Sequence, residues 1–156
     1  MQEIADASSV GRTTVYRHFP RREDLLRALF EHVVVEAQTS LSETASRSAP
    51  AEEVLNDLGG ALVAFGMRFR FLHAHRALGE QAFSESMEVP EDPVRQFLVG
   101  AIERGELRPG INLHWAQSVI QSLAIAAMDE LISGRVDADE AAAMLGETLV
   151  AALVAR

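Results

Sequence analysis

The chain has 156 residues, enough for one hydrophobic core or for one domain carrying a small module. It contains no cysteine, which excludes disulfides, thiolate metal sites and a cysteine nucleophile. The net charge of −9 argues against nucleic-acid binding by the whole surface, and no apolar run reaches the ~20 residues of a membrane span. We therefore expect a cytoplasmic protein without a membrane partner.

Helical periodicity runs through nearly the whole sequence, and Asn-Gly or Asp-Gly hairpin signals are missing. The predicted helices cover, in order, residues 2–7, 12–18, 23 to about 45, 50–72, 93–105, 112–133 and 137–155, with a shorter helix expected within 73–88. The predicted fold class is therefore all-α.

Local signals mark several helix starts. Pro50 is followed by two glutamates, which suit the positive end of a helix dipole. Asn112 is a candidate N-cap, and Asp137 with Glu140 has capping-box spacing.

The segment from Gly11 to Arg22 contains four arginines and no acidic residue, in contrast to the acidic whole. On a helix over 12–18, Val15 and Phe19 fall on one side, within about 40° of each other. The opposite side carries two threonines, at 13 and 14, and Arg17. These groups can hydrogen-bond base edges and phosphates, although a solvated arginine face on a surface helix pair is the alternative.

Two short helices joined by a few residues have the layout of a helix-turn-helix. The segment IADASSVGRTTVYRHFPRREDLL, residues 4–26, closely resembles the helix-turn-helix signature of the tetracycline-repressor (TetR) family of bacterial transcription regulators. The resemblance rests on Ile4, Ala5 and Ala7, on Val10, on the run TVYRHFP at 14–20, and on EDLL at 23–26.

This resemblance implies a helix-turn-helix DNA-binding module over residues 1–30 and an effector-binding and dimerisation domain over 31–156. It implies a homodimer on a palindromic double-stranded operator, released, as a repressor, by a small-molecule effector. The positions that would contact DNA, by match to the family, are Arg12, Thr13, Thr14, Tyr16, Arg17, His18 and Arg22.

The sequence departs from the family pattern at several positions. Ser9 stands at a turn position where the family prefers glycine, so we expect a less favoured backbone geometry there. Gly11 and Arg21 replace the usual capping serines. The family module has one more helix before the matched stretch, so we expect an upstream helix; the alternative is a truncated, repressor-like helical dimer that binds a small molecule without competent DNA binding.

Aromatic and methionine side chains of the second region are candidates to line the effector pocket, with plain core packing as the alternative. The candidates are Phe65, Phe69, Phe83, Met87, Phe97 and Trp115. Such a lining favours a small, apolar effector. His73 and His75 point about 200° apart on a helix, so we expect neither a metal site nor a cofactor, and no catalytic constellation predicts an enzyme.

The helices at 112–133 and 137–155 are too apolar to be covered by one neighbouring layer. Pairing with a second copy in a four-helix bundle would bury them, which predicts a homodimer. A buried hairpin within a monomer is the alternative.

Overall fold

The computed structural model describes residues 9–70 and 92–155, and helices dominate this part of the chain. The predicted all-α fold class is confirmed, with one isolated antiparallel bridge between Leu107 and Val154. The predicted helices at 2–7 and 73–88 lie outside the described residues. The helices are α2 Arg12–His18, α3 Arg22–Ala45, α4 Ala51–Arg68, α6 Pro93–Glu103, α7 Leu113–Ile132 and α8 Ala138–Leu153.

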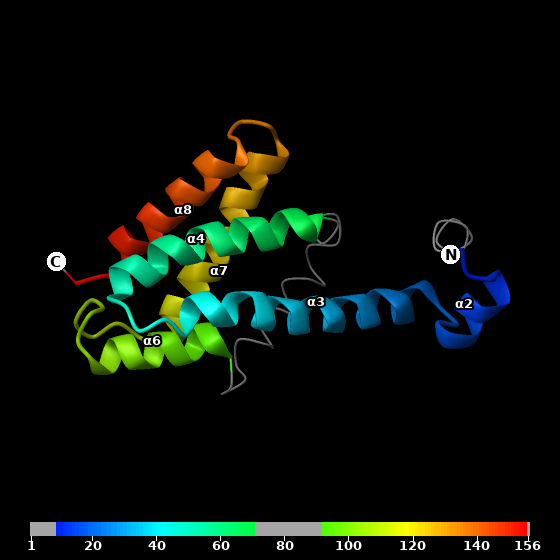
Figure 1. Ribbon diagram of the computed structural model, residues 1–156, viewed down its shortest axis with the longest axis horizontal. Helices are drawn as coiled ribbons and strands as arrows, with labels where there is room; N and C mark the ends of the chain where they lie inside the picture. The colour runs from blue at the N-terminus through cyan, green and yellow to red at the C-terminus, as the bar shows by residue number, and fades with distance from the viewer. Residues whose placement is uncertain (1–8, 71–91, 156) are drawn as a thin grey trace.

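Helix α3 links the two parts of the molecule (Figure 1). Its 24 residues span about 36 Å at the α-helical rise. One end lies beside α2, and the other end packs against α4 and α6. The short α2 therefore stands apart from the helical domain, joined to it by one continuous helix.

The helix ends follow the local signals of the sequence. The Asn112 side chain accepts a hydrogen bond from the Trp115 backbone N–H at 3.1 Å. At the start of α8, Asp137 accepts from the Glu140 N–H at 2.9 Å, and Glu140 accepts in return from the Asp137 N–H at 3.2 Å. The predicted caps at both helices are confirmed.

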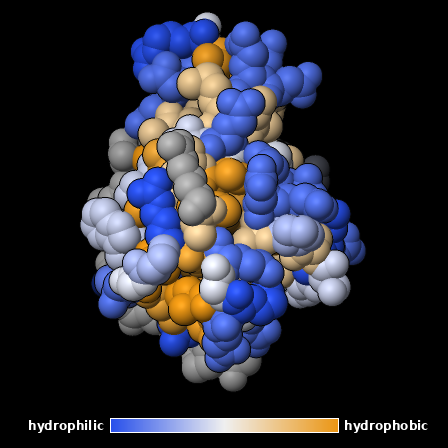
Figure 2. All heavy atoms as spheres, turned by 90° about the vertical axis from the view of Figure 1, so that its left-hand side faces the viewer, coloured by the Kyte–Doolittle hydropathy of each residue, from blue (hydrophilic) through white to orange (hydrophobic). Residues whose placement is uncertain are grey.

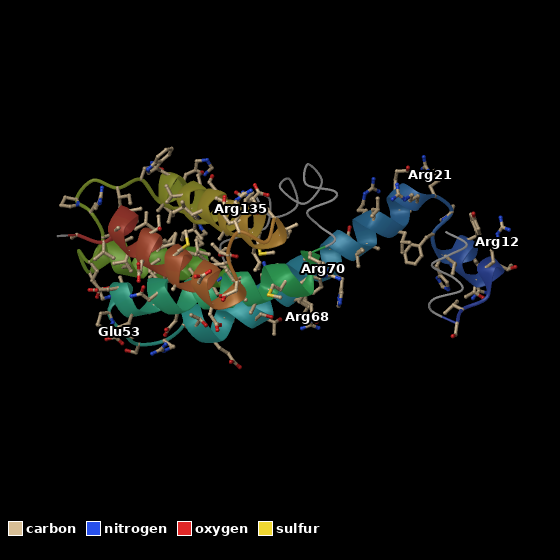
Figure 3. The ribbon with its side chains drawn as sticks, turned by 90° about the horizontal axis from the view of Figure 1, so that it is seen from above. Arg12, Arg21, Glu53, Arg68, Arg70 and Arg135 are labelled. Carbon is tan, nitrogen blue, oxygen red and sulfur yellow. The ribbon has the colours of Figure 1, made fainter. Side chains whose placement is uncertain are left out.

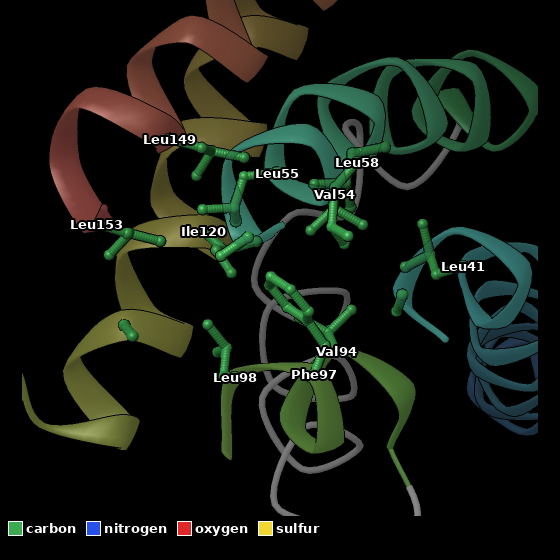
Figure 4. Close-up of a cluster of buried hydrophobic side chains, with 14 of the residues drawn as sticks. Leu41, Val54, Leu55, Leu58, Val94, Phe97, Leu98, Ile120, Leu149 and Leu153 are labelled. Atoms are coloured by element: carbon green, nitrogen blue, oxygen red, sulfur yellow. The ribbon is translucent and has the colours of Figure 1, made fainter. Parts of the chain in front are cut away.

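One hydrophobic core holds the helical domain together (Figure 4). Leu41 of α3, Leu55 of α4 and Leu98 of α6 belong to this core together with Ile120 and Leu149 from the C-terminal pair, and each is at most 3% exposed. Each such side chain contributes about 1.5–3 kcal/mol by burial. The C-terminal half of α3 is therefore part of the core.

The crossing of α4 and α8 depends on two glycines. A Cβ built on Gly59 would lie 2.5 Å from the backbone nitrogen of Gly146 and 2.7 Å from the carbonyl oxygen of Ala142. A Cβ on Gly146 would lie 2.7 Å from the Asn56 carbonyl oxygen. The two backbones are thus in direct contact, and no side chain fits between them.

We predict that Gly59→Ala lowers the free energy of unfolding by about 1–3 kcal/mol, because the methyl group must force the α4 and α8 backbones apart. The matched control is Gly60→Ala, since no neighbouring atom lies within 4 Å of a Cβ built there. Relief of the glycine helix penalty should raise stability by about 0.5–1 kcal/mol in the control. Urea denaturation measures both, and equal stability of the two variants would contradict the close crossing.

Glu106 joins the turn after α6 to the start of α4. Its carboxylate accepts from the Ala51 backbone N–H at 3.0 Å and from Arg104 Nε and Nη2 at 2.8 and 3.2 Å. The hydrogen bond from Arg104 lowers the pKa of Glu106, assisted by that from Ala51. The charged carboxylate thus caps a helix that begins 55 residues earlier in the chain.

We predict that Glu106→Gln lowers stability at neutral pH by about 0.5–1 kcal/mol. Because the folded pKa lies below the ordinary value of 4.5, the wild-type advantage is present above pH 4.5 and is lost as pH falls through the folded pKa. Denaturation between pH 3 and 7 measures the difference, with the exposed Glu43→Gln as the control. A difference that persists at the lowest pH would contradict the assignment.

Candidate nucleic-acid interface

Helix α2 has the two faces that the sequence predicts. Val15 is the buried residue of this helix, at 8% exposure. Thr13, Thr14 and Arg17 are exposed on the other side. The hydroxyls and the guanidinium therefore face solvent and are accessible to a large partner.

The polar side chains of this face are available for an external ligand. Within the described ranges, no side chain hydrogen-bonds or pairs with Thr13, Thr14 or Arg17. The Arg12 guanidinium lies over the Tyr16 ring, 5.4 Å from its centroid, and this contact holds both side chains on the same flank. His18 and Arg22 are exposed as well, so all seven predicted contact residues lie at the surface.

Positive charge gathers at this end of the molecule (Figure 3). Arg12 and Arg21 lie beside α2 and the start of α3, whereas Glu53 lies at the opposite end of the protein. The Arg21 guanidinium is mostly exposed and lies 3.7 Å from the Asp24 carboxylate. Asp24 also accepts from the Arg21 backbone N–H at 3.0 Å, which satisfies the N-cap donor of α3.

The turn before α2 is strained, as the sequence predicts. Ser9 has a φ of 56°, in the left-handed region that glycine adopts freely. A non-glycine residue there costs of order 1 kcal/mol. Gly11 occupies the N-cap of α2 and has no side chain that could accept a hydrogen bond from the free backbone N–H groups of the first helical turn. The two departures from the family pattern, Ser9 and Gly11, therefore fall in the same turn.

The structure separates the predicted pocket residues. Phe65 and Phe69 stack with their ring centroids 4.8 Å apart in a small cluster with Val33 and Ala37 of α3. Phe97 packs instead in the main core.

Trp115 lies on the surface of α7 and is 64% exposed. The main-core position of Phe97 favours the packing alternative for that residue, and the assignment of Trp115 to the effector pocket stays a prediction. Phe83 and Met87 lie outside the described residues.

The contact between α3 and α4 contains residues that the sequence did not single out. Arg68 Nη2 lies 2.9 Å from Glu36 Oε2, and the Arg68 guanidinium lies over the Phe69 ring at 5.3 Å. His32 Nε2 lies 4.0 Å from Glu36 Oε1 on the same helix. No local signal could have found the ion pair, since its partners are 32 positions apart on two helices.

A hollow of about 530 Å³ opens where the end of α3 meets α4 and α8. It contains none of the predicted pocket residues. Its lining is Thr44, Asn56, Asp57, Gly60, Ala61, Ala142, Ala143 and Glu147.

Residues 1–29 match the family model described as bacterial regulatory proteins, tetR family. Over 134 residues the chain is 28% identical to the HTH-type transcriptional repressor LfrR of Mycolicibacterium smegmatis, covering 85% of this chain and 69% of that protein. The N-terminal module of the chain, residues 1–29, is therefore of the TetR type. The matching family model and LfrR are both described as transcriptional regulators, which supports a DNA-binding regulator.

Solved structures share the fold of this chain. LfrR from Mycobacterium smegmatis in complex with proflavine has a TM-score of 0.72 at 22% identity, covering 99% of this chain and 85% of that one. A protein of unknown function from Rhodococcus sp. RHA1 has a TM-score of 0.74 at 20% identity, covering 99% and 84%. The SmeT–triclosan complex has a TM-score of 0.62 at 16% identity, covering 99% and 81%.

Two further observations concern only the part of the chain that the structure describes. None of its helices is long and apolar enough to cross a bilayer. Over the same residues, no group of three or more histidine or acidic side chains is arranged to hold a metal ion. His73 and His75 fall outside these ranges.

Proposed function

We propose that this chain is a TetR-family transcriptional repressor that binds a palindromic operator as a homodimer and is released by a small, apolar effector. The observation that carries the proposal is the exposed polar face of α2, mounted on the continuous helix α3. The face supplies DNA contacts, and the helix connects it to the core.

The proposed DNA contacts divide into two kinds. Thr13, Thr14 and Arg17 would read base edges or grip phosphates from α2 in the major groove. The flanking residues would position the helix on the phosphate backbone. These flanking residues are Arg12, Tyr16, His18 and Arg22.

A second copy is the proposed cover for the C-terminal helices. On α7, only Ala116, Gln117 and Ile120 are buried within one chain, although the helix is largely apolar. Pairing α7 and α8 with their copies would bury the remaining apolar area. Two subunits would then present two α2 helices about 34–36 Å apart, which matches successive major grooves.

Release of DNA would act through the contact of α3 with α4. Phe65 and Phe69 pack against Val33 and Ala37, midway between α2 and the core. An effector that prefers another packing of this cluster would move the α2 end of α3, and its differential affinity for the two arrangements would set the extent of release. Of the six predicted pocket residues, this phenylalanine pair is best placed for that role.

We predict that Arg17→Ala weakens operator binding by about 10- to 100-fold, because it removes a charged contact from α2. Arg22→Ala should weaken binding to all sequences alike and reduce the slope of log K against log [salt] by about 1. Arg70→Ala is the control, since Arg70 lies on the helical domain away from α2 (Figure 3). Fluorescence anisotropy measures each affinity. The labelled operator DNA is selected from the region upstream of the gene that encodes this chain.

Operator binding that Arg17→Ala and Arg22→Ala leave unchanged would refute the proposed interface. Absence of any salt-dependent binding by the wild-type chain would refute the repressor and favour the alternative of a small-molecule-binding dimer.

We predict that a small aromatic ligand releases the protein from its operator and that Phe65→Ala abolishes this release while operator affinity stays within about threefold. Proflavine and triclosan are the first probes, because related structures bind them. Titration of each probe into the anisotropy assay measures release. Val35→Ala, an exposed apolar residue of α3 outside the cluster, is the control. Release that survives Phe65→Ala would contradict the proposed route.

A further inference from the structure

Trp115 is an exposed tryptophan that the fold of one chain does not explain. It is 64% exposed at the start of α7, although its backbone is held by the Asn112 cap. A large aromatic side chain left in water forgoes the free energy of burial. Tryptophan is also one of the residue types enriched among the binding hot spots near the centres of protein interfaces. The side chain therefore indicates a contact outside its own chain.

The same face of α7 continues as a row of small residues. At about 100° per residue, Ser118, Ser122 and Ala126 fall within about 60° of the Trp115 direction. Ser122 and Ala126 are exposed and Ser118 is partly exposed. Small side chains at this spacing allow a second helix to approach closely.

At the far end of this row lies an apolar groove between α7 and α8, of about 140 Å³. An apolar cavity of about 150 Å³ holds a benzene ring, so the groove has the size for part of an indole. Its rim includes Met144, which is 53% exposed and whose thioether suits contact with an aromatic ring. The lining is Leu123, Ala126, Ala127, Glu130, Val136, Ala141, Met144, Leu145 and Thr148.

Trp115 cannot fill the groove of its own chain. It stands roughly 16 Å along the helix axis from Ala126, which lines the groove. A two-fold axis near Ser122 changes this relation, because two antiparallel copies of α7 would then place position 115 of one helix beside about position 129 of the other. The exposed indole and the groove are thus complementary parts of one self-pairing surface.

We propose that Trp115 of each copy inserts into the α7–α8 groove of a second copy of this chain. This rests on the homodimer of the proposed function and adds its register: α7 crosses α7 near Ser122, and each subunit gives one indole and receives one. A second copy is the partner that fits this surface. Under the two-fold relation the groove receives the indole of the other copy, and the row of small residues meets the same row on the other α7.

The first test uses the fact that Trp115 is the sole tryptophan of the chain. Its fluorescence reports its own environment in the unmodified protein. When the dimer is diluted into monomer, the emission should shift to longer wavelength and acrylamide quenching should rise. Analytical ultracentrifugation over the same concentrations identifies which species is present.

The second test is a double-mutant cycle on the dimer dissociation constant. Trp115→Ala should raise this constant about tenfold or more, as expected for a central aromatic anchor. Met144→Ala should raise it less, and the double variant should be little worse than Trp115→Ala alone, because both changes remove one contact. Within one chain the two side chains are too far apart to couple. Met67→Ala, an exposed methionine on α4, is the control and should leave dimerisation unchanged.

The outcomes separate the two proposals. A stable dimer in which Trp115 stays accessible to acrylamide, or in which the Trp115 and Met144 effects simply add, overturns the inserted indole and leaves the homodimer standing. A monomer at every concentration overturns both. Circular dichroism confirms that each variant is folded, and operator affinity of the wild type tests DNA binding independently.

Discussion

The unbroken course of α3 is the constraint on which the rest of the molecule depends. Its C-terminal half is locked into the core by Leu41 and Ala45, so its direction is determined by the packing of the helical domain. Its N-terminal end carries α2. A helix transmits a change of direction over its whole length because its backbone hydrogen bonds resist bending, so a small tilt in the core displaces α2 by a larger distance.

The contacts along α3 differ in strength, and the weaker contact is the one that a bound effector could most readily change. Near Leu41 the helix is held by α4 and α6 in a continuous apolar core. Nearer α2 it is held by a separate group, in which Phe65 and Phe69 meet Val33 and Ala37, with the partly exposed Glu36–Arg68 pair beside it. This group has far fewer buried residues than the main core, and a partly exposed ion pair adds at most about 1 kcal/mol, so this second contact is the weaker one. A repressor that must change the spacing of its recognition helices needs such a contact.

Charge and hydrophobicity are divided between different surfaces. The basic residues beside α2 form the end that would meet DNA, while the acidic balance resides in the helical domain. At the end of the domain opposite α2, apolar atoms are bordered by polar and charged ones (Figure 2). The exposed apolar face of α7, with Trp115 and the groove, is a third kind of surface. It suits another protein surface rather than nucleic acid.

The sequence by itself determined the local features. It predicted the bounds of α2, the caps at Asn112 and Asp137, the strained turn at Ser9 and the TetR-type module at the N-terminus, because each depends on neighbours within a few positions. Only the tertiary structure decided which aromatic residues meet. Phe97 entered the core, Phe65 joined α3 and Trp115 stayed at the surface, although all three have the same hydrophobic signal. The α4–α8 crossing at Gly59 and the Glu36–Arg68 pair likewise join residues far apart in the chain. Periodicity shows that a helix has an apolar face that must be covered. Which element covers that face is set by how whole helices pack against one another.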